Sequence, residues 1–437
     1  MAGLETTDEL FDLRMSDGAK PLLAKAKAFV REEVDPVTLE FFQLGEGRAE
    51  RWSWAPGQLE LLDRLKKKAK ANGLWNFFLP DADTGQGLKN LDYAYIAAEL
   101  GKNPIASECL NCSAPDTGNM EVLERVGTPA QKEQWLKPLL AGEIRSAYAM
   151  TEPDVASSDA TNIATTITRS GGDYIVHGKK WFITGAAHPD CSFLIVMGVS
   201  DAEAARTQRH SCIIVPMNAK GVRLVRPLRW MGCEDYVAPI GELEFNHVRV
   251  PAENLLGKEG EGFKVAQVRL GPARLHHCMR SIGTCEVLIE LMMARAAERK
   301  AFGRAVIEYD TVQGWIAHSR VELEQARLLT YRCAWLLDRD GHHGAWRDVS
   351  IVKIVVPAML QRIADRAMQV FGAMGGSDDT PIHQALAWGR LLRIGDGPDE
   401  VHLRQVFRME RHPPWSIADS PYLDRSQRNV AEPELAE

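Results

Sequence analysis

The chain has 437 residues, of which 45% are hydrophobic and 25% charged, and these proportions are ordinary for a globular protein with two or three domains. Its formal net charge of −7 argues against nucleic acid or an anionic membrane surface as the main partner. No apolar run approaches the roughly 20 residues that span a bilayer, and the acidic opening MAGLETTDELFDL resembles neither a secretory signal nor a transit peptide, so we expect a cytoplasmic protein with no membrane span.

Residues 1–144 are predicted to form an N-terminal helical domain, because helix formers dominate this part of the chain. Apolar side chains recur there at the helical spacings of three and four residues, at Leu59, Leu62, Leu65 and Ala69. The intervening lysines are interpreted as a solvated helix face: Lys66, Lys67, Lys68 and Lys70. Farther along, Thr128 is expected to cap a helix that has Pro129 at its first position.

Residues 145–257 contain short β-branched segments such as DYIVHGKKWFITG and SCIIVPM. Turn-forming residues separate these segments, among them Gly171, Gly178 and Asn218. The pattern predicts a small middle domain of antiparallel strands.

Residues 258–411 return to helical spacing, for example at Val312, Ile316 and Leu323, and predict a C-terminal four-helix-bundle domain. The composition of residues 412–437 is typical of an extended tail. The order of helices, strands and helices gives an α+β fold class that is mostly α.

Eight cysteines in a chain of this length do not indicate a disulfide framework. Cys109 and Cys112 form a single CxxC pair without a second pair or a thioredoxin-like context, and we interpret them as small buried residues. The run His276-His277-Cys278 suggests metal ligands, but neighbouring positions on a helix point in different directions. No metal site is therefore predicted.

The run AYAMTEPDVASSDATNI, Ala147 to Ile163, gathers hydroxyl, carboxylate and amide side chains around Pro153. It resembles the Tyr-x-x-Thr-Glu-Pro-x-x-Gly-Ser-Asp flavin loop of the acyl-CoA dehydrogenase family. Further segments match that family in the same order: GKKWFITGA, VRVPAENLLG, ERKAFG, QVFGAMGG and RLLRIGDGPDEV. The chain lacks a G-x-G-x-x-G between a strand and a helix, which disfavours a Rossmann-type NAD enzyme.

The resemblance implies a noncovalent FAD between the middle domain and the C-terminal bundle. The residues matched to FAD contacts are Tyr148, Met150, Thr151, Ser157, Ser158, Phe182, Ile183, Thr184, Arg299, Phe302, Gln313, Gln369, Phe371, Gly372, Gly375, Pro398 and Glu400. In the family, the residues that match Arg299 and Gln313 meet the FAD of a neighbouring subunit, and the segment that matches Gln369 to Gly375 contacts its adenosine half. A homodimer or homotetramer is therefore expected.

The resemblance also implies α,β-dehydrogenation of an acyl-CoA to the 2-enoyl-CoA, in which a carboxylate removes a Cα proton while a hydride leaves Cβ for flavin N5. Asp396 stands where most members have a glutamate, which is one methylene longer, and Ala273 at the alternative base position cannot serve. Asp396 is therefore the predicted base, and a cap of the final helix is the alternative role. Ser158, Arg274, Gly397 and Arg408 are implied to contact substrate, with ordinary salt bridges as the alternative for the two arginines.

An electron-transferring flavoprotein is the expected electron acceptor. Three alternatives stay open. The segments TEPDVASSDATN and DGPDEVHL resemble a subgroup that suggests flavin-assisted loss of phosphate from a 4-phosphoacyl-CoA. An O2-using flavin oxidase of the same fold is the second alternative. A scaffold protein that lost its base is the third, and Asp396 in place of glutamate is its support.

Overall fold

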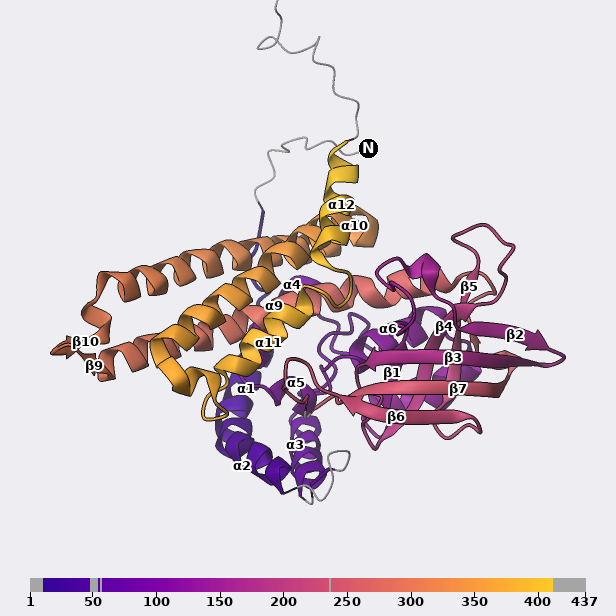
Figure 1. The fold of residues 1–437 in the computed structure, drawn as a ribbon, viewed down its shortest axis with the longest axis horizontal. Helices are drawn as coiled ribbons and strands as arrows, with labels where there is room; N and C mark the ends of the chain where they lie inside the picture. Colours follow the sequence, from indigo (N-terminus) through magenta and orange to yellow (C-terminus); the bar gives the residue numbers. More distant parts are fainter. Residues whose placement is uncertain (1–10, 48–53, 56, 236, 412–437) are drawn as a thin grey trace, which may run out of the picture.

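The structure is a computed structural model that describes residues 11–47, 54–55, 57–235 and 237–411. The expected tail at 412–437 and most of the acidic opening lie outside the described residues. The sheet lies at one end of the molecule, and a long helical arm extends to the opposite end (Figure 1).

The N-terminal part is helical, as predicted. Its helices are α1 (Lys20–Phe29), α2 (Asp35–Glu46), α3 (Gln58–Ala71), α4 (Asn90–Leu100), α5 (Ala106–Cys109), α6 (Asp116–Val126), α7 (Pro129–Gln131) and α8 (Lys137–Leu140), with π-helical turns η1 (Val30–Val34) and η2 (Lys132–Leu136). The predicted helix start at Thr128 is confirmed, because Thr128 and Gln131 form a reciprocal capping box and Pro129 is the first helical residue.

One part of the lysine interpretation is wrong. Lys67, Lys68 and Lys70 on α3 are exposed, as expected for a solvated face. Lys66 is only 14% exposed in its side chain and forms an ion pair with buried Glu108 on α5. Its neighbours Leu62 and Leu65 face the core, so the same turn of α3 carries the Lys66 side chain inward to Glu108.

The middle part is an eight-stranded sheet. Its order is β6 (Val222–Leu228), β7 (Ile240–Pro251), β3 (Asp173–Ile183), β2 (Thr166–Ser170), β4 (Cys191–Val199), β5 (His210–Pro216) and β8 (Leu255–Leu256), with β1 (Arg145–Ala149) paired to β4. Short 3₁₀ turns lie at η3 (Ala160–Asn162) and η4 (Ala252–Asn254). Most pairings are antiparallel, as predicted, but β1 and β2 each pair with β4 in parallel. The sheet is therefore mixed, because β1 enters from the helical domain and returns to β4 only after a long crossover.

The C-terminal part contains α9 (Gly262–Glu298), α10 (Asp310–Phe371), α11 (Ile382–Leu392) and α12 (Asp399–Glu410). A hairpin of β9 (Lys300–Ala301) and β10 (Arg304–Ala305) and the turn η5 (Val306–Glu308) join α9 to α10, and η6 (Gly372–Gly376) follows α10. Gly341, at φ 67° and ψ −172°, kinks α10 into two antiparallel segments. Gly283 lets α9 cross α4 closely, since a Cβ there would lie 1.8 Å from the carbonyl oxygen of Ala98.

Strand β1 belongs to both hydrophobic cores of the described chain. The Tyr148 side chain packs into the larger core, which the helices share with one face of the sheet. Ala147 and Ala149 pack into the second core on the other face. This alternation fixes the register of β1, and the loop that follows it starts from a defined position.

None of the described helices is long and apolar enough to cross a bilayer. Within the described residues, no three or more His, Cys, Asp and Glu side chains gather in a way that could hold a metal ion. All eight cysteines are free, and Cys109 and Cys112 are buried, as predicted.

Candidate functional site

Asp396 lies in the tight turn between α11 and α12. It has a positive φ of 55°, and Gly397 follows at φ 102°. The alternative role of Asp396 as a helix cap is wrong, because α12 begins at Asp399 and its N-cap residue is Pro398. The left-handed backbone at Asp396 is uncommon for a residue with a side chain and is found preferentially where function requires it.

A buried lysine holds this turn. Lys353 on α10 is 1% exposed, and its ammonium group donates to the carbonyl oxygens of Leu392, Gly395 at 2.8 Å and Gly397 at 3.5 Å. Lys353 was not predicted as a site residue, because its partners are backbone atoms that lie about 40 residues away in the chain. The Lys353 side chain therefore holds the backbone of the turn that carries Asp396 against α10.

The Asp396 carboxylate faces two side chains of α9. Its Oδ1 lies 3.3 Å from Nη1 of Arg269, and its Oδ2 lies 3.5 Å from Nε2 of His277. Burial by itself would raise the pKa of Asp396, but the contact with His277 and the charges of Arg269 and Lys353 outweigh burial and hold the pKa far below its usual range. Asp396 is therefore ionised, and its side chain keeps 18% exposure.

Arg269 and His277 were not predicted as site residues. They are eight positions apart on α9, which is about two helical turns, so both side chains reach the same turn. Both residues are buried. The available signal was a pair of ionisable residues at helical spacing within a helix whose other inward positions are mostly apolar.

Arg269 also connects Asp396 to β1. The centre of its guanidinium group lies 5.0 Å from the ring centroid of Tyr148, a cation–π arrangement. The Tyr148 hydroxyl points into the sheet, 3.9 Å from sulfur atoms of Met197 and Cys212. The structure thus brings the predicted base next to the strand that leads into the flavin-like loop.

A second buried lysine holds that loop. Lys180 on β3 has no exposed surface, and its ammonium group donates to the carbonyl oxygens of Met150 and Met197 at 2.8 and 2.7 Å and to Glu152 at 2.8 Å. Glu152 in turn accepts the backbone N–H groups of Ala164 and Thr165. Both ends of the loop are therefore tied to one buried ion pair, and the sequence analysis included Lys180 only as part of a matched strand.

The loop and the end of β3 present groups that suit a flavin. Phe182 has a positive φ of 50° and a ring that is 37% exposed, with the indole of Trp230 at 6.2 Å edge-on. Thr151 and Thr184 are half-buried and Ser158 is exposed, whereas Ile183 is buried in the second core. The Ser157 hydroxyl already accepts the Glu152 N–H at 2.9 Å. An exposed aromatic side chain in the same region as exposed or half-buried hydroxyl groups fits the ring system and polar edge of FAD.

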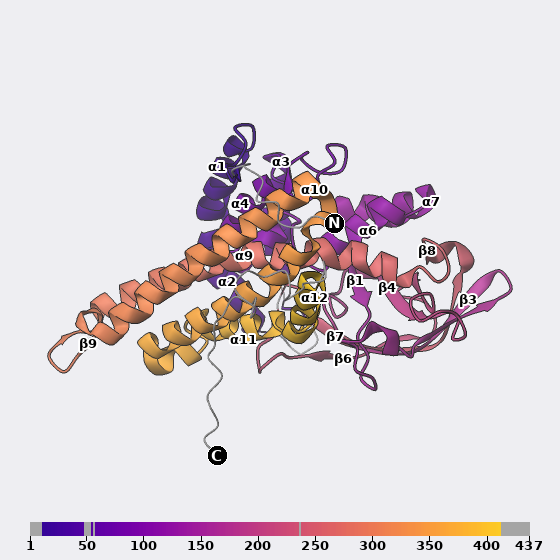
Figure 2. The same cartoon turned by 90° about the horizontal axis from the view of Figure 1, so that it is seen from above.

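The remaining matched residues form a separate group near the β9–β10 hairpin. Nη1 of Arg299 donates to the carbonyl oxygen of Phe371 at 3.0 Å, and a Cβ on Gly372 would lie 2.9 Å from the same nitrogen. Phe302 at the hairpin tip is 99% exposed and has a positive φ of 52°. Gln313 and Gln369 are exposed, and Gly375 is buried. Figures 1 and 2 show this hairpin at the opposite end of the molecule from the sheet, so one chain does not bring the two groups together.

The residues matched to substrate contacts have mixed surroundings. Arg274 donates through Nε to the backbone carbonyl of Asp396 at 2.8 Å instead of pairing with a carboxylate. Gly397 leaves no room for a side chain, because a Cβ would lie 2.9 Å from Nε2 of His402. Arg408 is exposed on α12, as is Glu400, which was matched to FAD. The roles of all these residues stay predictions.

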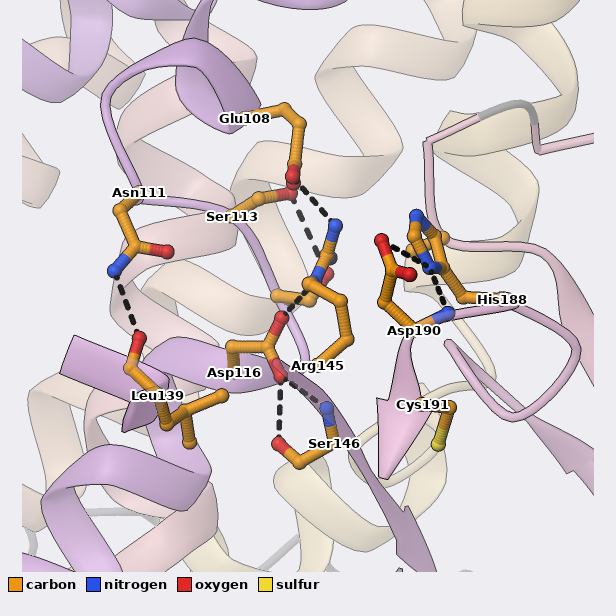
Figure 3. A network of polar contacts seen from close by, with 12 residues as sticks. Glu108, Asn111, Ser113, Asp116, Leu139, Arg145, Ser146, His188, Asp190 and Cys191 are labelled. Atoms are coloured by element: carbon orange, nitrogen blue, oxygen red, sulfur yellow. Dashed lines mark hydrogen bonds and ion pairs between the residues drawn. The ribbon is translucent and has the colours of Figure 1, made fainter. Parts of the chain in front are cut away.

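A buried charged network supports β1 from the side of the helical domain. Figure 3 shows Arg145 of β1 between Glu108 and Asp116, with which it forms ion pairs. Asp116 also accepts the backbone N–H of Ser146 at 2.8 Å and its hydroxyl at 2.6 Å. Burial and the charge of Arg145 lower the pKa of nearby His188 to about 2, so His188 is neutral. The network anchors the strand that carries Tyr148.

Comparisons with known proteins all indicate one family. Family models described as the N-terminal, middle and C-terminal domains of acyl-CoA dehydrogenase match residues 16–143, 147–248 and 260–409. FadE2 of Mycobacterium tuberculosis, named as an acyl-CoA dehydrogenase, is 51% identical over 80% of this chain and 85% of that protein. Acyl-CoA dehydrogenase family member 11 of Gallus gallus is 47% identical over 93% of this chain and 52% of that protein. The chain therefore spans about half the length of such vertebrate relatives.

A solved structure gives the same result at the level of the fold. It is assigned to the acyl-CoA dehydrogenases, comes from Mycobacterium abscessus and superposes with a TM-score of 0.86. It is 44% identical in sequence and covers 91% of this chain and 98% of that one.

Proposed function

This chain belongs to the acyl-CoA dehydrogenase family, and from that premise we propose that it is an FAD-dependent acyl-CoA dehydrogenase. The proposed reaction is α,β-dehydrogenation of an acyl-CoA thioester to the 2-enoyl-CoA. We propose a homodimer or homotetramer as the assembly, an electron-transferring flavoprotein as the electron acceptor, and the cytoplasm as the location.

One observation carries the proposal. The Asp396 carboxylate and the Tyr148 strand are far apart in sequence, yet Arg269 contacts both, at 3.3 Å and 5.0 Å. A carboxylate next to the start of a flavin-like loop is the arrangement that proton removal coupled to hydride transfer requires. This support combines the sequence match of the loop and of Asp396 with the contacts that Arg269 makes to both.

The chain's own residues would act mainly on the proton. Asp396 is ionised in the free protein, which is the state in which a base must begin. Its depressed pKa makes it a weak base, and an acyl chain that fills the site would remove water and strengthen it. Phe182, Thr151, Thr184 and Ser158 would hold the flavin ring. FAD, when bound, would supply the hydride acceptor.

The charges around Asp396 favour one alternative substrate. Arg269 and Arg274 both reach the Asp396 turn from α9. Cationic groups near the acyl site suit an anionic substituent, and a phosphate on C4 of the acyl chain is such a group. Net conversion of a 4-phosphoacyl-CoA with phosphate release and no electron acceptor would establish this route, whereas strict dependence on an acceptor would exclude it.

The main test is an anaerobic absorbance spectrum of the purified protein before and after addition of a panel of acyl-CoAs. We expect an oxidised-flavin spectrum that bleaches or gains a long-wavelength charge-transfer band with the substrate. Peroxide release in air would identify the oxidase alternative, and a flavin that responds to no acyl-CoA would favour a scaffold. Absence of flavin after incubation with FAD would refute the proposal.

A further inference from the structure

His277 lies between a cation and the predicted base. Its Nε2 is 3.5 Å from Oδ2 of Asp396, and its Nδ1 is 3.0 Å from Nη2 of Arg280 on the next turn of α9. The indole of Trp388 on α11 packs against the imidazole with ring centroids 5.8 Å apart. The ring is therefore enclosed on both nitrogen sides and on one edge.

The contact with Arg280 determines which nitrogen carries the proton. A guanidinium group has only donors, so the Nδ1 that faces Arg280 must be an acceptor. The proton of the neutral imidazole is then on Nε2, which faces Asp396. The distance of 3.5 Å is at the outer limit of a hydrogen bond, and catalytic contacts of this kind commonly shorten when substrate binds.

The surroundings keep this imidazole neutral. Burial lowers the pKa of His277 to about 4, and the positive charges of Arg280 and Lys353 act in the same direction against the opposing effect of Asp396. The other charged or titratable groups that face the Asp396–His277 pair come from three helices: Arg269 and Arg274 on α9, Lys353 on α10 and His402 on α12. His276, the chain neighbour of His277 on α9, faces away from Asp396. Above about pH 4 the imidazole of His277 is therefore neutral, and its Nε2–H group faces Asp396 as a donor.

We propose that His277 is a positioning residue for Asp396: a neutral Nε2–H donor, fixed in this tautomer by Arg280, that orients the carboxylate and favours its ionised form. The inference rests on the proposed function, since it assumes that Asp396 is the base. It adds the chain Arg280–His277–Asp396, in which each group sets the state of the next. His277 itself does not touch the reacting atoms.

The neighbouring His276 provides a matched control. It is also buried on α9, with 2% exposure, but its ring faces Tyr93 and Phe78 at 4.9 and 6.1 Å instead of Asp396. Replacement of either histidine by phenylalanine keeps an aromatic ring in the core. A difference between the two variants therefore reports the contact with Asp396.

The kinetic test compares His277→Phe, His277→Gln and His276→Phe in the holoenzyme. We expect His277→Phe to keep its flavin content and substrate affinity and to lose at least about tenfold in kcat. The acidic limb of the kcat–pH profile reports Asp396 in the substrate complex, where the bound acyl chain raises its pKa, and this limb should shift upward by about one pH unit because the carboxylate loses a donor. His277→Gln, which retains a donor, should return the limb towards the wild-type position. His276→Phe should keep the wild-type profile.

Two kinetic results would overturn the proposal: a wild-type acidic limb and kcat in His277→Phe, or equal changes in His277→Phe and His276→Phe. A second readout does not depend on activity. In ¹⁵N-histidine NMR of the wild-type protein, assigned with His277→Gln, His277 should show a protonated Nε2 and an unprotonated Nδ1, and Arg280→Met should abolish this preference.

The reverse tautomer in the wild-type protein would refute the inference even if His277→Phe failed to fold. A wild-type protein that turns over no acyl-CoA would instead count against the proposed function, and the NMR result would still decide the role of His277.

Discussion

At the scale of single residues, the strongest expectation concerns the turn before α12. Asp396→Asn removes the charge that Arg269 and His277 face but keeps the shape of the side chain. We expect the variant to retain FAD and to lose about 10²–10⁴-fold in kcat, the usual contribution of a general base. Flavin absorbance and steady-state turnover measure the two properties, and a variant with near wild-type turnover would refute Asp396 as the base.

Glu121 on α6 gives a prediction about pH. Its side chain is 3% exposed, and Oε2 has no hydrogen-bond partner among the described residues. Burial raises the pKa of Glu121 from 4.5 to about 8, so the folded state holds this proton more tightly than the unfolded chain does. The associated stability is complete below pH 4.5 and is lost as the pH rises to about 8, at up to about 1.4 kcal/mol per pH unit.

Glu121→Gln cannot ionise and should therefore remove this pH dependence. Urea unfolding at several pH values between roughly 5 and 8, the window over which the shifted pKa acts, measures this dependence. Glu143→Gln, at an exposed position, is the control and should keep the wild-type slope. An unchanged slope in Glu121→Gln would contradict the assignment.

At the scale of elements, the loop between β1 and β2 depends on the buried pair of Lys180 and Glu152. Lys180→Met removes the ammonium donor of the Glu152 carboxylate, of the Met150 carbonyl in the loop and of the Met197 carbonyl on β4, and breaking a buried pair in this way costs about 3–5 kcal/mol. We expect a lower thermal midpoint and loss of FAD on gel filtration. Lys179→Met is the matched control, because Lys179 is the exposed neighbour on the same strand. Equal thermal midpoints and equal FAD retention in the two variants would show that the Lys180–Glu152 pair does not hold the loop.

The elements of the fold could be predicted from the sequence, but several residues around Asp396 could not. Local patterns were sufficient for the order of helices and strands and for the Thr128 cap, since each depends on neighbouring residues. Asp396 became a candidate through the family resemblance. Arg269, His277 and Lys353 were missed because they meet Asp396 only through the packing of α9 and α10 against a distant turn. Lys180 was not singled out because a lysine in a strand is usually solvated.

At the scale of the whole molecule, the hairpin after α9 is expected to serve a second subunit. Arg299→Ala should reduce FAD retention or the size of the assembly. Arg299 is the residue matched to the FAD of a partner subunit, and it is exposed, with its guanidinium group beside Gly372. Flavin content and light scattering measure these properties. Lys300→Ala, an exposed neighbour, should leave both unchanged. Unaltered flavin content and size in Arg299→Ala would count against a shared site.

The distance between the hairpin and the sheet within one chain also has a genetic consequence. Under the proposal, each complete site takes Asp396 from one subunit and Arg299 from its neighbour. A subunit altered at Asp396 still offers an intact hairpin, and a subunit altered at Arg299 still offers an intact carboxylate. Two alleles that are each inactive alone would therefore complement each other when coexpressed, because every mixed pair of subunits contains one site with both wild-type residues.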